Sequence, residues 1–151
     1  MKKHVRPATK EDASRIAEIL IFAKRTSYRD IFKNDRVSFG TMQVYPLAQE
    51  YINNPINLEG VYVYDDEFVK GMLHLKDSEI IELYIDPFFQ GQNIGGTLFE
   101  FAKDKGCNHL WVLEKNQPAI NFYTKHNFEL TKTRKLFPFT DQHIVKMSKR
   151  H

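Results

Sequence analysis

The sequence has only one cysteine, Cys107, so an internal disulfide bond is excluded. It has no apolar run close to the roughly 20 residues that a membrane-spanning helix needs. Its first residues also lack the apolar core of a signal peptide. We therefore expect a cytoplasmic protein without a membrane segment.

A strong excess of charge of one sign is also missing. The formal net charge is +3, and basic residues are scattered until a locally basic stretch over residues 132–150. Such a stretch is more often a solvated face, and the pattern does not favour a nucleic-acid surface. We expect no nucleic-acid partner, and a nucleic-acid-binding domain is only a minor alternative.

The length and composition are typical of one folded domain. The chain has 151 residues, of which 42% are hydrophobic and 27% charged. This composition is not that of a disordered segment or of a membrane protein. We find no internal repeat, low-complexity tract or linker. The prediction is a single domain over residues 1–151.

Residues 79–101 predict a strand, a loop and a helix in succession. Apolar residues over 80–85 are typical of a central strand that is covered on both faces. The spacing of Ile94, Leu98 and Phe101 keeps one helical face apolar. The loop between them is rich in Gly and Asn. Its free backbone N–H groups and the positive helix end favour a phosphate or pyrophosphate, with a plain chain-reversing turn as the alternative.

The remaining pattern alternates strands and helices. Strands are predicted over residues 4–8, 60–64, 68–75, 80–85, 109–113, 128–131 and 143–147. Helices are predicted after a Thr9–Asp12 cap, over much of residues 35–51 with an interruption or kink at Pro46, and after a cap at Asn116. A helix separates strands 80–85 and 109–113, so we expect these two to be parallel within an otherwise antiparallel sheet.

The run DPFFQGQNIGGTL, residues 86–98, resembles the acetyl-CoA loop of the GCN5-related N-acetyltransferase (GNAT) superfamily. The pattern of that loop is Gln or Arg, two variable residues, Gly, one variable residue, and then Gly or Ala. Gln90 fills the first position and Gly95 the last, but Asn93 replaces the middle Gly. Asn is the residue after Gly that most easily accepts a left-handed backbone. The change is nevertheless a departure from the pattern, and it is compatible with a weakened or slightly reshaped pyrophosphate site.

A second run, LWVLEKNQPAINFYTKHNF at residues 110–128, is similar to another GNAT pattern: a strand, an Asn, then Ala, Phe-Tyr and a terminal Gly-Phe. Asn127 stands in place of that Gly. The two runs occur in the family's order. The resemblance is close over residues 61–128 and loose at the start, over residues 6–9.

The resemblance implies an α/β (α+β) fold of the GNAT type. This is a mixed, mostly antiparallel central sheet of about seven strands, with helices on both faces and a splayed parallel pair of strands. It implies direct transfer of an acetyl group from acetyl-CoA to a primary amine of a small molecule, peptide or protein, without a metal. A homodimer is compatible with it. An acyl-CoA-binding module without turnover is the alternative, because Asn93 departs from the pattern and no unique base stands out.

The resemblance also assigns catalytic roles. Tyr123 matches by position the acid that protonates the departing CoA thiolate, and a phenol with an ordinary pKa of about 10 is protonated at neutral pH. A core aromatic is the commoner role of such a residue. The base that removes the amine proton through water is expected at Glu79 or Glu82, which we place on opposite faces of the central strand. Glu114 is a third candidate.

Binding residues follow from the same resemblance. The main chain of Leu83, Tyr84 and Ile85 is expected to pair with the pantetheine arm and polarise the thioester carbonyl. The other predicted CoA-binding residues are Gln90, Gly91, Gln92, Asn93, Ile94, Gly95, Gly96, Thr97, Asn116 and Tyr123. Tyr28, Phe32, Phe137 and Phe139 are expected to line the acceptor site or to belong to the core. His74 and His109 lack a second ligand at metal spacing, and Cys107 lacks a basic partner that would make it a nucleophile.

Overall fold

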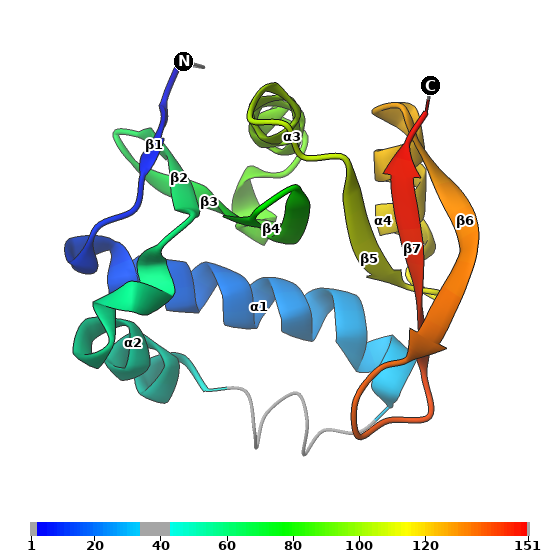
Figure 1. Ribbon diagram of the computed structural model, residues 1–151. Coiled ribbons are helices and arrows are strands. Elements are labelled where there is room, and N and C mark those ends of the chain that lie inside the picture. The colour runs from blue at the N-terminus through cyan, green and yellow to red at the C-terminus, as the bar shows by residue number, and fades with distance from the viewer. Residues whose placement is uncertain (1–2, 34–42, 151) are drawn as a thin grey trace.

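A computed structural model describes residues 3–33 and 43–150 (Figure 1). They form a seven-stranded sheet in the order β1-β2-β3-β4-β5-β7-β6, in which β4 and β5 are parallel and all other neighbours are antiparallel. The strands are β1 (Val5–Pro7), β2 (Val61–Asp66), β3 (Phe68–Lys76), β4 (Glu79–Ile85), β5 (His109–Leu113), β6 (Phe128–Leu136) and β7 (His143–Lys149). The predicted mixed sheet with one parallel pair is confirmed.

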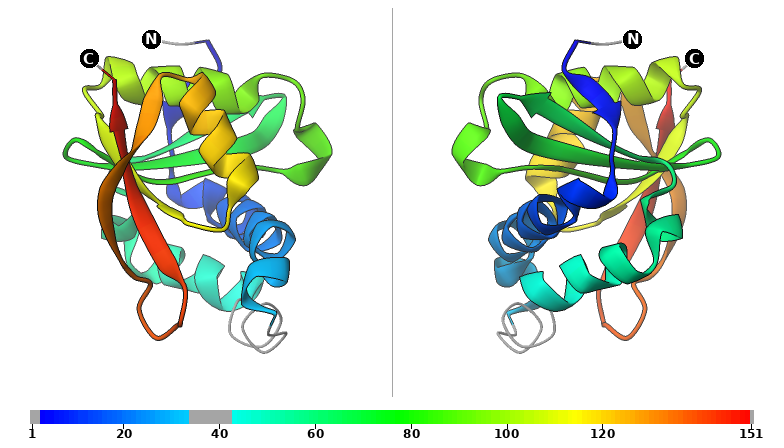
Figure 2. Two further views of the ribbon diagram at one scale, coloured as in Figure 1. Left: turned by 90° about the vertical axis from the view of Figure 1, so that its right-hand side faces the viewer. Right: turned by 90° about the vertical axis from the view of Figure 1, so that its left-hand side faces the viewer.

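Within residues 3–33 and 43–150, four α-helices cover the two faces of the sheet (Figure 2). They are α1 (Ala13–Phe32), α2 (Val44–Asn53), α3 (Ile94–Asp104) and α4 (Gln117–Lys125). Short 3-10 turns lie at η1 (Lys10–Asp12), η3 (Pro55–Leu58) and η4 (Pro87–Phe89). No helix of the described residues has the length and apolar character needed to cross a membrane.

Two apolar cores lie on opposite sides of the sheet because successive strand residues point to opposite faces. On β3, Met72 packs in the core beneath α1, whereas its neighbour Leu73 packs in the core beneath α3. Leu98 and Phe99 of α3 are fully buried in the second of these cores. The position of the sheet between its helices is therefore set by alternating side chains of the central strands.

The start of α1 follows the predicted cap. The Thr9 N–H donates to the Asp12 carboxylate at 2.8 Å, and Arg6 donates to both oxygens of the same carboxylate at 2.8 and 3.0 Å. The helix then continues without a break to Phe32, through a segment over residues 26–32 to which the sequence pattern assigned no element. This length brings the C-terminal half of α1 alongside β4.

Pro46 does not interrupt or kink a helix, so that prediction is wrong. Helix α2 begins at Val44, which places Pro46 in the first turn. The N–H groups of a first turn have no partner within the helix, so a residue without an N–H fits there. The earlier part of the predicted helix, residues 35–42, lies outside the described residues.

A β-bulge in β4 changes which side chains share a face. Along β3 and β4 the paired residues are Lys76 with Glu79, Leu75 with Ile80, and His74 with Glu82. Ile81 is therefore an extra residue in β4, and paired residues of an antiparallel sheet share a face. The prediction that Glu79 and Glu82 point to opposite faces is wrong: both lie on the face that α1 covers.

The cover of β4 agrees with the prediction, whereas the extent of β6 does not. Helix α3 packs on one face of β4 and helix α1 on the other, although Ile81, the extra residue of the bulge, is 39% exposed. β6 does not end at Thr131 but continues to Leu136 after an irregularity between Leu130 and Arg134. Its second half is polar and exposed, so it lacks the apolar pattern from which strands are predicted.

Candidate active site

The parallel strands β4 and β5 separate soon after they begin. They pair only at Glu79 with His109 and at Ile80 with Leu110, although β4 continues to Ile85 and β5 to Leu113. A groove of about 860 Å³ lies at this opening and is lined from both strands and from α1, α3 and α4. The predicted splayed pair is confirmed.

The open edge of β4 presents main-chain groups to the groove. The Asp86 N–H donates to the Lys70 carbonyl of β3 at 3.0 Å. In an antiparallel pair the residues that bond to one neighbour alternate, so Tyr84 also directs its main chain to β3. The N–H and C=O groups of Leu83 and Ile85 therefore face the groove. Of the three residues predicted to pair with the pantetheine arm, only Leu83 and Ile85 direct their main chain toward the groove.

The loop before α3 forms one end of the groove. Gln90, Gly91 and the first residues of α3 line it, whereas Gln92 and Thr97 do not. Gly91 and Asn93 have φ values of 87° and 60°. Asn93 is the residue before the helix, and its side chain makes no hydrogen bond to the first-turn N–H groups. The N–H groups at the positive end of α3 are therefore not occupied by a side-chain cap.

The two asparagines that replace family glycines both have a left-handed backbone. Asn93 has φ 60° and Asn127 has φ 75°. Both asparagines therefore adopt the left-handed conformation that Asn accepts most easily after Gly. The Asn93 side chain also restricts which residue fits at position 96, because a Cβ added to Gly96 would lie 2.3 Å from the Asn93 Oδ1.

Tyr123 reaches the groove from α4. Its ring lies 5.6 Å from that of Phe99 and 5.5 Å from that of Phe122, measured between centroids. Burial, and then the nearby Tyr28 phenol, raise the pKa of Tyr123. The phenol therefore stays protonated at neutral pH and can donate. Asn116 caps α4 as predicted, since its side chain accepts from the Ala119 N–H at 3.4 Å, and it also lines the groove.

Polar side chains meet on the α1 side of the groove. The phenol oxygens of Tyr28 and Tyr84 lie 2.8 Å apart. Glu82 Oε2 lies 3.5 Å from Lys24 Nζ, and Glu82 Oε1 lies 3.7 Å from His74 Nδ1. Lys24 was not predicted, because only its spacing of four residues from Tyr28 on one helix could have indicated that both face the groove.

The two partners of Glu82 keep it ionised. Burial raises its pKa, but the nearby His74 imidazole and the Lys24 ammonium together hold the pKa below its usual range. Glu82 lines the groove. The other two candidates for a base do not: Glu79 lies 3.7 Å from His109, and Glu114 is bound to Arg134 at 3.0 Å.

The predicted acceptor-lining aromatics separate into three groups. Tyr28 and Phe137 line the groove. Phe32 lies behind them, with ring centroids 5.8 Å from Tyr28 and 6.1 Å from Phe137. Phe139 is fully exposed, outside both the groove and the core.

Among the described residues, no group of three or more His, Cys, Asp or Glu side chains could hold a metal ion.

Residues 57–130 match the family model described as "Acetyltransferase (GNAT) domain". This match identifies residues 57–130 of the chain as a GNAT domain. A curated relative, an uncharacterized N-acetyltransferase of Methanocaldococcus jannaschii, is 34% identical over an alignment of 76 residues, and the match covers 46% of this chain. The match covers 34% of that relative, so the chain spans about a third of the length of the relative.

Solved structures share the GNAT fold at low identity. Apo YjaB from Escherichia coli has a TM-score of 0.71 at 19% identity, with 95% of each chain covered. The PaiA N-acetyltransferase from Thermoplasma acidophilum, in complex with coenzyme A, has a TM-score of 0.73 at 18% identity, with 97% of this chain and 98% of that chain covered. The N-acetyltransferase from Staphylococcus aureus Mu50 has a TM-score of 0.73 at 14% identity, with 95% and 98% covered.

Proposed function

We propose that this GNAT protein acts as a single domain that transfers an acetyl group from acetyl-CoA directly to a primary amine. The observation that carries the proposal is the convergence on one groove of an unpaired β4 edge, the uncapped start of α3 and the protonated phenol of Tyr123. These are the three groups that a bound thioester with a diphosphate requires: a partner for its amide arm, an anion site and an acid.

In the proposed complex the pyrophosphate lies at the start of α3. The N–H groups around Gly91, Asn93 and Gly95 and the positive helix end stabilise its charge. The pantetheine arm then runs along β4 and pairs with the main chain of Leu83 and Ile85. The same edge places an N–H close to the thioester carbonyl, where it stabilises the negative charge that develops on the oxygen during transfer.

The proposed reaction is an attack of the neutral amine nitrogen on the thioester carbonyl carbon. The carbon–sulfur bond breaks, and the Tyr123 phenol gives its proton to the departing CoA thiolate. The amine loses a proton, which passes through water toward Glu82. Because its pKa is lowered, Glu82 stays ionised. Its main role in this mechanism is that its carboxylate holds and orients the acceptor amine.

The experiment that tests the role of Tyr123 is turnover of Tyr123→Phe with acetyl-CoA against a panel of primary amines. We expect a loss of 10²–10⁴-fold in kcat with little change in acetyl-CoA affinity, the range typical of general acid catalysis. Tyr45→Phe, at a tyrosine of α2 that is 72% exposed, is the matched control. Unchanged kcat in Tyr123→Phe would remove this residue from the mechanism.

Calorimetry with acetyl-CoA on the same samples separates the enzyme from an acyl-CoA-binding module. An enzyme binds acetyl-CoA and releases CoA thiol when an acceptor is added. Saturable binding without transfer to any amine would support the binding module instead. The left-handed backbone of Asn93 supports acetyl-CoA binding under either hypothesis, because it retains the loop conformation that the family's glycine would adopt.

A further inference from the structure

The described residues that line the groove offer little negative charge to a cationic acceptor. Among the described residues that line it, Glu82 is the one carboxylate. Lys24 lies 3.5 Å from Glu82 and neutralises it, while Lys125 and His126 line the same groove. An acceptor with several positive charges would require several carboxylates here. The charge balance therefore disfavours polycations such as polyamines.

A singly charged ammonium also meets an unbalanced site. It would join Lys24 as a second cation beside Glu82, whose side chain is 18% exposed. A buried charge without a partner costs free energy, and here one of the two cations would have none. An acceptor that brings its own negative charge removes this imbalance, because it supplies a partner for Lys24.

We propose that the acceptor is a zwitterionic amine of the amino-acid type, in which Glu82 holds the ammonium and Lys24 holds a carboxylate of the same molecule. This inference rests on the proposed function and adds the chemical class of the acceptor. The ammonium and carboxylate of an α-amino acid are close neighbours in the molecule, as Lys24 and Glu82 are in the groove. The ammonium then gives one proton to water, which leaves the neutral amine that attacks the thioester.

The Lys24–Glu82 pair is loose enough to admit such a molecule. Its 3.5 Å separation exceeds the roughly 2.7–2.9 Å of a close charge-assisted hydrogen bond. The Lys24 side chain is 27% exposed and has a flexible stem, so its ammonium can move while its backbone stays in α1. Glu82 keeps its second partner, His74, and remains positioned on β4.

Aromatic residues beside this pair fit an apolar side chain on the acceptor. Tyr28, Trp111 and Phe137 line the groove from α1, β5 and the segment after β6. Lys135 makes a cation–π contact with the Trp111 ring, with its Nζ 4.2 Å from the ring centroid. The proposed acceptor therefore combines a zwitterionic head with an apolar or aromatic body.

The test compares amines that differ only in the carboxylate. Phenylalanine and phenethylamine form one such pair, and leucine and 3-methylbutylamine form another. Initial rates of CoA thiol release give kcat/KM for each amine. We expect the amino acid to be preferred, and we expect the ratio of the two kcat/KM values to fall at least tenfold in Lys24→Met. Because the same two amines are used with the wild type and with Lys24→Met, their different intrinsic reactivities cancel when the two ratios are compared.

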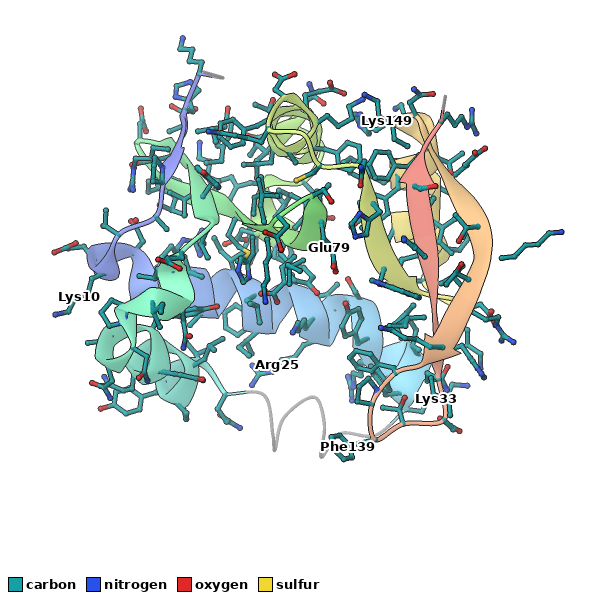
Figure 3. The ribbon with its side chains drawn as sticks, viewed as in Figure 1. Lys10, Arg25, Lys33, Glu79, Phe139 and Lys149 are labelled. Atoms are coloured by element: carbon teal, nitrogen blue, oxygen red, sulfur yellow. The ribbon has the colours of Figure 1, made fainter. Side chains whose placement is uncertain are left out.

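Two further variants control this test. Lys24→Arg keeps the charge and should retain the preference for the amino acid, which a purely structural role of Lys24 would not require. Lys10→Met is the matched control, at an exposed lysine on η1 at the edge of the molecule (Figure 3). It should leave the ratio unchanged.

The outcomes distinguish this inference from the proposed function. Acetyl transfer to phenethylamine or spermidine at rates equal to or above those for the amino acids would overturn the acceptor class and leave the acetyltransferase standing. An unchanged ratio in Lys24→Met would also overturn it, and so would acetyl-CoA binding without transfer to any carboxylate-bearing amine. A protein that does not bind acetyl-CoA would overturn both proposals.

Discussion

The phenol oxygens of Tyr28 and Tyr84 lie 2.8 Å apart, so a hydrogen bond joins α1 to β4 beside the groove. Tyr28→Phe removes one partner and leaves the half-buried Tyr84 hydroxyl without it. We expect a loss of about 1 kcal/mol in the free energy of unfolding, the usual net value of such a bond. Urea unfolding measures it, with Tyr45→Phe as the exposed control. Equal stability of Tyr28→Phe and the wild type would mean that this bond contributes nothing.

Asn93 and Gly96 should be energetically coupled. A methyl group at Gly96 would lie 2.3 Å from the Asn93 Oδ1, whereas one at Gly95 would meet its nearest neighbour, in the Phe122 ring, at 3.4 Å. Because Asn93 Oδ1 is the tip of a side chain that can rotate, we expect Gly96→Ala to cost about 1 kcal/mol, the low end of overpacking, and Gly95→Ala to cost less.

A double-mutant cycle checks this coupling. Asn93→Gly removes the colliding oxygen and keeps a residue that accepts φ 60°. In that background Gly96→Ala should lose most of its cost, giving a coupling free energy of about 0.5–1 kcal/mol. Additive effects of the two substitutions on chemical unfolding would contradict a direct contact.

The backbone at Asn127 predicts a difference between glycine and β-branched residues. With φ 75°, Asn127→Gly should be close to neutral, whereas Asn127→Val should cost about 1–3 kcal/mol because a β-branched residue is strained in this conformation. Thermal unfolding of the two variants measures the difference. If the Val variant proved as stable as the Gly variant, the left-handed conformation at this position would be wrong.

The Arg6–Asp12 ion pair predicts a pH dependence of stability. Hydrogen bonds from Arg6 are the largest cause that lowers the pKa of Asp12, and they outweigh its burial. A carboxyl group whose pKa is lowered on folding stabilises the protein above its unfolded pKa, which is about 3.9. That contribution is lost as the pH falls through the lower pKa of the folded state.

Asp12→Asn tests this dependence. The difference in unfolding free energy between wild type and variant should be largest near neutral pH and should shrink below about pH 4, where Asp12 becomes protonated. Urea unfolding at a series of pH values measures it. A difference that stays constant down to pH 2 would show that the charge of Asp12 does not contribute.

Features that depend on neighbours in the chain could be predicted from the sequence. The capping box of Thr9 and Asp12 at η1, just before α1, the cap of α4 at Asn116 and the left-handed backbone at Asn93 and Asn127 each follow from local steric and hydrogen-bonding preferences. The parallel pairing of β4 with β5 also follows, because a helix connects them.

Features that depend on register or on distant contacts could not be predicted. The bulge at Ile81 shifts Glu79 onto the same face as Glu82, and the alternation of a single strand contains no sign of it. The pairing of Lys24 with Glu82 joins residues of α1 and β4 that are far apart in the chain. The position of Pro46 in α2 depended on where that helix begins, and boundaries are set partly by tertiary contacts.

An amide NMR titration with acetyl-CoA tests most directly whether the cosubstrate binds in the opening between β4 and β5. The proposed complex predicts saturable shifts for the amides of Leu83 and Ile85 and for residues 91–96, with slower hydrogen exchange at Leu83 and Ile85. Tyr84, whose main chain faces β3, should change less in exchange. Absence of saturable binding, or shifts confined to residues outside this groove, would contradict the proposed cosubstrate site.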